Sequence, residues 1–343
     1  MFEPLLARLS DRYHLVAPDY PGFGHSDWPD PKKFAYTFDH IAEIMNHFTE
    51  ALGLSRYTVY MQDYGGPVGF RMLLAHPERI EALIVQDAVA HNTGLGANWK
   101  TRRAFWADRA SNESALRINL LSLETTRTRH VGNDPNVERY NPDLWTDEFY
   151  FLNQPGQGDI QVDLFYDYRT NVDSYPKWQA WMREKQPRLL VIWGKYELSF
   201  DPSEPEAYRR DVPKAEVHIV DGGHFALDTR RMKLRSSSGA SRSSGGKRTK
   251  RNFSVELPVY SDQGLGWNCA KESSRRLLSM RNGPFTLAYG AMLMLGMAER
   301  ATARDAVAQD KGYSSPRRAS SFTISIRHDR STRNLLASRK IWS

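Results

Sequence analysis

Short apolar runs alternate with amphipathic segments along the first two thirds of the chain. The clearest helical pattern covers 38–54, where Ile41, Ile44, Met45 and Phe48 share one face. Apolar runs of strand length, rich in β-branched and aromatic residues, predict buried strands. These strands are expected at 13–17, 56–61, 82–86, 189–193 and 216–220. Strands that alternate with helices are typical of an α/β fold around a mostly parallel sheet.

A long helical segment interrupts this alternation. Between 92 and 187 the pattern becomes helical, aromatic and irregular, and strand patterns return only at 189–193 and 216–220. A sheet interrupted in this way is typical of a core that carries a lid. We therefore predict a core in two parts, 1–91 and 188–231, with a helical cap over 92–187.

The last third of the chain has a different composition. Residues 232–343 hold 21 Lys and Arg against 7 Asp and Glu, so this segment alone has a balance of +14, whereas the whole chain has +7. The run SSSGASRSSGGKRTKR at 236–251 has the low complexity of a flexible tail. Apolar pieces at 282–298 and 322–326 show no convincing period. We predict a disordered basic tail over 232–343.

Composition excludes several classes of protein. A hydrophobic content of 40% with 12% aromatic residues indicates a sizeable core, and a single cysteine excludes a disulfide scaffold or a cysteine-built zinc site. The longest apolar run, 285–298, is too short to span a bilayer, and the start has no signal-peptide pattern. We expect a cytoplasmic protein without a metal, a membrane partner or a specific nucleic-acid partner. The oligomeric state stays open.

The first chemical feature is QDYGG at 62–66, between a predicted strand and a predicted helix. A sharp turn from strand to helix lifts one side chain above the sheet, and the glycines allow close packing beneath it. That side chain is Asp63, so the predicted nucleophile is a carboxylate. The amide of Tyr64 would face a developing oxyanion at the helix N-terminus, and Gln62 would lie beside it in the pocket. The alternative is that Asp63 only caps the helix.

A histidine and an acid follow two later strands. His224, in DGGHF (221–225), lies on a glycine-rich loop after the last strand, where a general base would be placed. Glu197, in GKYEL (194–198), follows the strand 189–193 and could orient that histidine. The order nucleophile, acid, histidine, each after its own parallel strand, is that of the α/β-hydrolases.

The chain from 1 to about 229 resembles an α/β-hydrolase of the epoxide hydrolase and haloalkane dehalogenase branch. The resemblance implies an α/β-hydrolase fold and a small-molecule substrate, with no cofactor. It also implies that Asp63 forms an alkyl ester with the substrate, which water activated by His224 then hydrolyses. The matching stretches are APDYPGFGHSD (17–27), QDYGGPVGFRMLLAHPERI (62–80), LFYDYRTN (164–171), RLLVIWGKYEL (188–198) and DGGHFALD (221–228).

Three tyrosines bear on the choice between an epoxide and a halide. Tyr168 precedes an arginine, as the ring-opening tyrosine does in epoxide hydrolases, and Tyr150 is a candidate for the second lid tyrosine. Haloalkane dehalogenases resemble one another in having tryptophan after the nucleophile, where this chain has Tyr64. The resemblance therefore favours an epoxide or a similar small electrophile, with a haloalkane or haloacid dehalogenase as the alternative.

The acid of the catalytic group has two candidates. The family usually has aspartate where this chain has Glu197, so the carboxylate is kept with a longer reach. Some haloalkane dehalogenases instead take the acid from the end of the strand after the nucleophile helix, where Asp87 stands here. We prefer Glu197.

The chain departs from the family at both ends. The resemblance implies three further strands and a His-Gly-x-Pro loop before the helix at 2–9, and a final helix after the match stops near 228. One of those strands belongs between 13–17 and 56–61, so its absence predicts a gap within the sheet with unpaired backbone groups. A third hypothesis follows: a truncated, inactive hydrolase whose basic tail binds polyanions without specificity.

Overall fold

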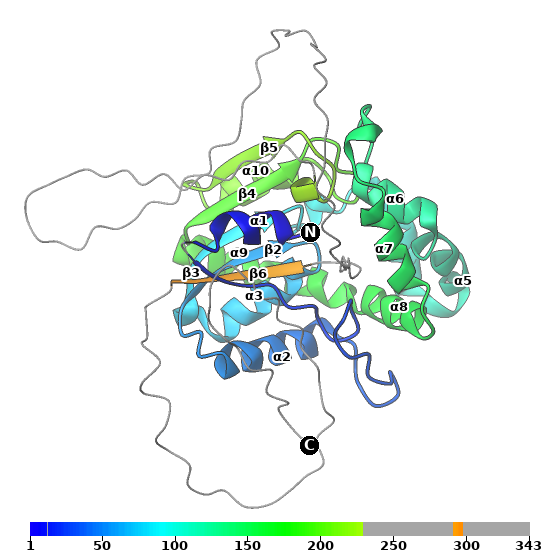
Figure 1. The fold of residues 1–343 in the computed structure, drawn as a ribbon, viewed down its shortest axis with the longest axis horizontal. Coiled ribbons are helices and arrows are strands. Elements are labelled where there is room, and N and C mark those ends of the chain that lie inside the picture. Colours follow the sequence, from blue (N-terminus) through cyan, green and yellow to red (C-terminus); the bar gives the residue numbers. More distant parts are fainter. Residues whose placement is uncertain (12, 229–290, 298–343) are drawn as a thin grey trace, which may run out of the picture.

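The computed structural model describes residues 1–11, 13–228 and 291–297. Within these residues the chain forms one six-stranded sheet with helices on both faces (Figure 1). The strand order is β1-β6-β2-β3-β4-β5, and the four strands β2, β3, β4 and β5 run parallel to one another. The strands are β1 (Tyr13–Val16), β2 (Tyr57–Gln62), β3 (Ile80–Gln86), β4 (Leu189–Gly194), β5 (Glu216–Val220) and β6 (Ala291–Met297).

The two faces of the sheet are covered differently. Side chains of a strand alternate between faces, so the central strands contribute to two separate apolar clusters. Val59, Leu83 and Val191 face the larger cluster, together with α2 (Phe38–Ala51), α3 (Gly65–Ala75), α9 (Arg169–Lys185) and α10 (Glu204–Asp211). Tyr60, Ile84 and Ile192 face the smaller one, where α1 (Glu3–Leu9) packs.

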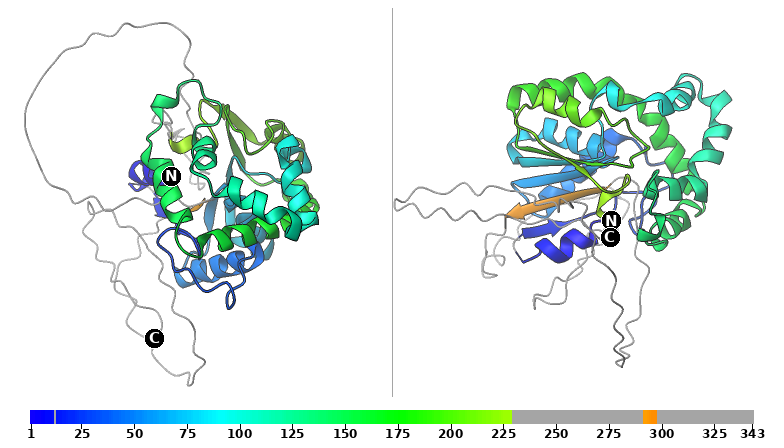
Figure 2. Two further views of the ribbon diagram at one scale, coloured as in Figure 1. Left: turned by 90° about the vertical axis from the view of Figure 1, so that its right-hand side faces the viewer. Right: turned by 90° about the horizontal axis from the view of Figure 1, so that it is seen from above.

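Helices fill the chain between β3 and β4, where the sequence predicts the cap. Helices α5 to α8 lie together beyond one end of the strands, and α9 returns to pack against α3 (Figure 2). The carboxyl ends of the parallel strands therefore face the cap, which is where α/β sheets bind their ligands. The cap helices before α9 are α4 (Lys100–Ala107), α5 (Arg109–Leu120), α6 (Leu123–Val131), α7 (Asp143–Leu152) and α8 (Gln157–Asp167).

The strand β6 is the main departure from the sequence prediction. Ala291–Met297 lies antiparallel between β1 and β2, at the position where a gap was expected. Its residues pair with 13–16 on one side and with 57–62 on the other. The expectation of an open gap between β1 and β2 was therefore wrong. The rest of the predicted tail lies outside the described residues.

Candidate active site

Asp63 lies at the turn between β2 and α3. Its φ of +45° is in the left-handed region that residues other than glycine rarely adopt, at a cost of roughly 1–3 kcal/mol. Close packing holds the turn in this shape, because a Cβ on Gly66 would lie 2.9 Å from the Cβ of Ala88. The side chain of Asp63 is buried, with 8% of the residue exposed. The predicted sharp turn is therefore present, and it lifts a carboxylate above the carboxyl end of the sheet.

His224 joins the two predicted carboxylates. Its Nδ1 lies 2.5 Å from Oε2 of Glu197, and its Nε2 lies 3.2 Å from Oδ2 of Asp63. Asp63 follows β2, Glu197 follows β4 and His224 follows β5. The parallel strands therefore bring together groups that are far apart in the sequence. All three are buried, and His224 is only 1% exposed. Such an arrangement can supply a nucleophile, a base and an acid that orients the base.

Backbone and side-chain contacts fix the loop that carries His224. Gln62 and Gln86 each donate an Nε2–H to the carbonyl oxygen of His224, at 3.3 and 3.2 Å. Gln86 is itself held by the hydroxyl of Tyr60, 2.5 Å from its Oε1. We expected the side chain of Gln62 to lie in the pocket. Its amide instead donates to the loop that carries His224 and helps to hold that loop in position.

The structure distinguishes between the two candidate acids. Glu197 contacts His224 through Oε2, while its Oε1 accepts the amides of Ser199 and Phe200. Asp87 is fully buried and uses Oδ1 to accept the amide of Gly194 at 2.8 Å. Burial, and then the charge of Glu197, raise the pKa of Asp87 well above its ordinary value. The neutral form of Asp87 is therefore favoured.

The charge state of His224 depends on its two carboxylates. Burial lowers the pKa of the imidazole, but Glu197 and Asp63 outweigh that effect and raise the pKa well above its ordinary value. The imidazolium form is therefore stable while Asp63 is charged. If Asp63 became an ester, one of the two raising contributions would disappear and the pKa of His224 would fall.

Two buried cap tyrosines lie close to the nucleophile. Tyr168, at the start of α9, is 1% exposed, and its ring lies 6.1 Å from that of Tyr64. Burial raises its pKa well above the ordinary value, and the nearby Tyr175 and Asp63 raise it further, so the phenol keeps its proton. Tyr175 was missed by the sequence analysis. Its spacing of two helical turns from Tyr168 was a signal, since such residues share one helix face.

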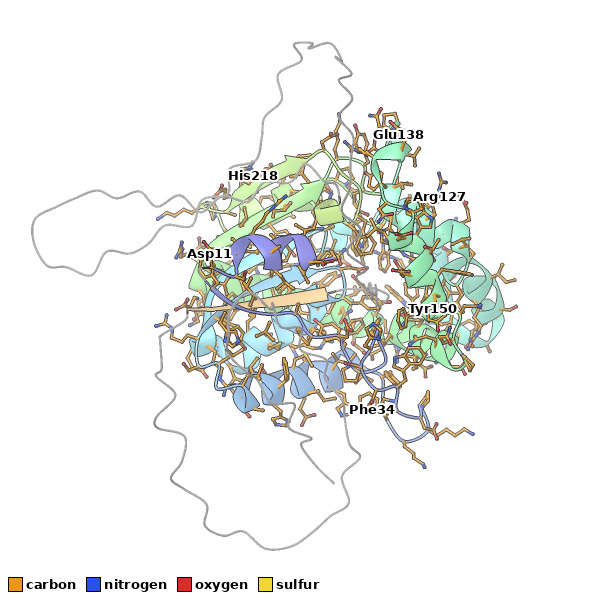
Figure 3. The ribbon with its side chains drawn as sticks, in the orientation of Figure 1. Asp11, Phe34, Arg127, Glu138, Tyr150 and His218 are labelled. Carbon is orange, nitrogen blue, oxygen red and sulfur yellow. The ribbon has the colours of Figure 1, made fainter. Side chains whose placement is uncertain are left out.

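Tyr150 does not belong to this group. It lies on α7 with 61% of the residue exposed, and Figure 3 shows it on the cap away from the sheet. Its ring contacts that of Phe151 at 5.3 Å. The expectation that Tyr150 lines the pocket is therefore corrected. Tyr175, in contrast, is fully buried.

Two kinds of feature are absent from the described part of the chain. No cluster of three or more His, Cys, Asp or Glu side chains there could hold a metal ion. No helix among the same residues is long and apolar enough to cross a membrane.

Comparisons with known proteins give the family. Residues 1–230 match the α/β hydrolase fold family. An uncharacterized hydrolase of Saccharomyces cerevisiae is 34% identical over 233 residues, covering 67% of this chain and 80% of the yeast protein. Haloalkane dehalogenase 2 of Mycobacterium tuberculosis is 34% identical over 85 residues, or 25% of this chain and 29% of its own.

More distant relatives agree on the fold. A cis-3-alkyl-4-alkyloxetan-2-one decarboxylase of Xanthomonas campestris is 23% identical over 255 residues, with 66% of this chain and 79% of that protein covered. The solved 2-hydroxy-6-oxo-6-phenylhexa-2,4-dienoate hydrolase from Rhodococcus matches with a TM-score of 0.50 at 21% identity, over 66% of this chain and 79% of its own. With its sheet, its cap and its match over residues 1–230, this chain belongs to the α/β-hydrolase family and is a hydrolase of that family.

Proposed function

We propose that this hydrolase opens an epoxide, or a similar small electrophile, through an ester on Asp63. The single observation that carries the proposal is the carboxylate at the strand-to-helix turn in contact with His224 Nε2, at 3.2 Å. A carboxylate nucleophile forms an alkyl ester, and that ester needs a second agent to hydrolyse it. His224, held by Glu197, is placed to be that agent.

The first half of the reaction opens the ring. A carboxylate oxygen of Asp63 attacks an epoxide carbon, and the electron pair of the breaking C–O bond goes to the ring oxygen. Tyr168 donates its phenolic proton to that oxygen and is reprotonated from solvent. The raised pKa of Tyr168 keeps the proton in place until an alkoxide, a stronger base than phenolate, develops beside it.

The second half hydrolyses the ester. Esterified Asp63 has no charge, so the pKa of His224 falls and the neutral imidazole becomes available as a base. His224 takes a proton from water, and the hydroxide attacks the ester carbonyl of Asp63. The amide of Tyr64, the residue before α3, donates to the resulting oxyanion. Collapse expels the diol as an alkoxide, which takes its proton from His224. The carboxyl proton left on Asp63 then passes to His224, which restores the carboxylate and the imidazolium.

The tryptophans nearest the site argue against the dehalogenase alternative. A halide leaving group needs indole or similar N–H donors that are not already used. Trp99, whose ring lies 4.9 Å from that of Tyr168, donates its Nε1–H to the carbonyl of Ser199 at 2.8 Å. Trp106 likewise donates to Phe165 at 2.8 Å. With tyrosine at position 64, this leaves an epoxide as the better substrate class.

The test is to trap the ester. In His224→Gln the attack should proceed while hydrolysis stops, so incubation with an epoxide should add the mass of the epoxide to the peptide containing Asp63. His91→Gln is a matched control, since His91 is also a buried histidine between two carboxylates. It should show turnover and no lasting adduct. An unmodified Asp63 peptide in His224→Gln, with turnover retained, would overturn the proposal.

A further inference from the structure

Arg102 lies in the cap one aromatic ring away from the catalytic group. Its guanidinium carbon is 4.7 Å from the ring centre of Trp99 and 5.6 Å from that of Phe165. The ring of Trp99 contacts Tyr168 at 4.9 Å and Phe200 at 5.6 Å, and Phe200 in turn contacts His224 at 5.7 Å. Trp99 therefore lies between the guanidinium of Arg102 and the ring of Tyr168.

Arg102 has no carboxylate partner among the described residues. Among the described residues Arg102 forms no ion pair, and its hydrogen bond is to the carbonyl of Asn98 at 3.3 Å. Four other cap arginines each lie within 4 Å of a carboxylate: Arg109, Arg117, Arg129 and Arg139. Burying a guanidinium without such a partner costs folding free energy, unless another anion pairs with it.

The charges around Arg102 are those of the site itself. Burial lowers its pKa, and the groups that oppose this are Tyr64, Asp63, Tyr168 and Glu197. The second cation nearby, Arg129, also interacts with Asp63, but Glu148 lies 2.8 Å from it and balances its charge. Of these two arginines that interact with Asp63, Arg102 is therefore the one without a carboxylate partner among the described residues.

We propose that Arg102 binds a carboxylate on the substrate while the electrophilic carbon lies at Asp63, so that the natural substrates are epoxy acids or related electrophilic carboxylates. The proposal rests on the proposed function and names its substrate class. A guanidinium can bind a carboxylate through two parallel hydrogen bonds, which fixes orientation as well as position. One arginine balances one negative charge, whereas a phosphate monoester would leave excess negative charge beside Asp63. A carboxylate is therefore the better fit.

The first experiment compares two substrates of nearly equal shape, glycidate and glycidamide. Losing a charged hydrogen-bonded contact typically weakens binding by about 10- to 100-fold. The wild-type protein should prefer glycidate by that factor in kcat/KM, mostly through KM. Arg102→Met should lose the preference and keep its rate on glycidamide within about threefold. Arg103→Met, which changes the exposed neighbouring arginine, is the control and should behave as wild type.

The second experiment measures binding without turnover. Glycerate, the diol that glycidate would give, should bind the wild-type protein more tightly than glyceramide by calorimetry, and Arg102→Met should remove the difference. The proposed carboxylate site is wrong, and the epoxide chemistry stands, under either of two results. One is an equal kcat/KM of the wild-type protein on glycidamide and glycidate, and the other is an equal loss of activity on both substrates in Arg102→Met. If glycerate binds through Arg102 while neither epoxide is hydrolysed, the carboxylate site stands and the epoxide chemistry is wrong.

Discussion

Two buried histidines in this molecule each lie between two carboxylates, and only one of them is a candidate for catalysis. His224 contacts Glu197 at 2.5 Å and Asp63 at 3.2 Å. His91 contacts Glu204 at 2.8 Å and Asp211 at 3.2 Å. In both cases burial lowers the pKa of the imidazole and the carboxylates raise it above its ordinary value. By composition, burial and charge the two clusters are nearly the same.

The surroundings of the second carboxylate separate them. Asp211 ends α10 and is held by Arg183 at 3.0 Å as well as by His91. Glu204 accepts the amide of Ala90 at 2.7 Å, so the cluster fastens the start of the cap segment to α10. Asp63, in contrast, stands on a strained turn below Tyr168. A histidine between two acids is therefore a common way to join segments, and it becomes a candidate catalytic group only where an acid faces a substrate.

The strongest test of this comparison replaces one aspartate by asparagine in each histidine cluster. Asp63→Asn should abolish turnover, by at least about 10⁴-fold, because the attacking carboxylate is gone. Asp211→Asn should keep kcat within about threefold, since Asp211 touches nothing that reacts. Steady-state kinetics of the two purified variants on one epoxide decide the matter. A comparable loss in both would mean that the His91 cluster supports catalysis.

A smaller effect is expected at the cap. Tyr168→Phe should slow epoxide opening by roughly 10- to 1000-fold, as expected for the loss of one proton donor to the developing alkoxide. The loss should fall on ester formation, which rapid-mixing experiments separate from ester hydrolysis. Tyr150→Phe is the matched control, because that tyrosine is exposed, and its rates should not change. If only ester hydrolysis were slowed, Tyr168 would act in the second half of the reaction and the prediction would be wrong.

The smallest effect concerns stability. His91→Gln should lower the free energy of unfolding by about 1–3 kcal/mol, since a buried charged contact is lost, and should leave kcat within about twofold. The folded pKa of His91 is raised by Glu204 and Asp211, so its contribution is full below about pH 6.5 and is lost as pH rises through the folded pKa. Burial raises the pKa of Glu204, so its contribution to stability also falls as pH rises.

Urea unfolding near pH 6 and again near pH 9 measures this dependence. The gap between wild type and His91→Gln should shrink at the higher pH. His218→Gln is the control, because His218 lies on β5 with 28% of its side chain exposed (Figure 3). A gap that widens with pH would show that His91 is held neutral.

The candidate site was predictable where it depends on strand order. Asp63, Glu197 and His224 each follow a parallel strand, and the carboxyl ends of such strands meet at one edge of the sheet. Sequence patterns locate strand ends well, so the convergence could be foreseen. They do not tell which way a side chain turns, which is why Gln62 was assigned to the pocket although it holds the histidine loop.

Features that depend on packing between distant segments were not predictable. Arg102 has no motif, and its place beside Trp99 depends on how α4 sits over the sheet. The same holds for His91, whose two acids come from α10. Tyr150 and Tyr175 are both helical tyrosines in the sequence, and only their burial distinguishes them. The pairing of β6 was missed because a short apolar run without a period matches many partners equally well.

The position of β6 has a consequence for how the chain acquires its fold. Strands β1 and β2 meet through a segment at 291–297, so the middle of the sheet depends on contacts of very high sequence separation. Such contacts slow folding, because a long loop must close before they are made. During synthesis the N-terminal residues leave the ribosome well before residue 297 does. Until then the edges of β1 and β2 that pair with β6 are unpaired. A chaperone would therefore matter most to the nascent chain during this interval.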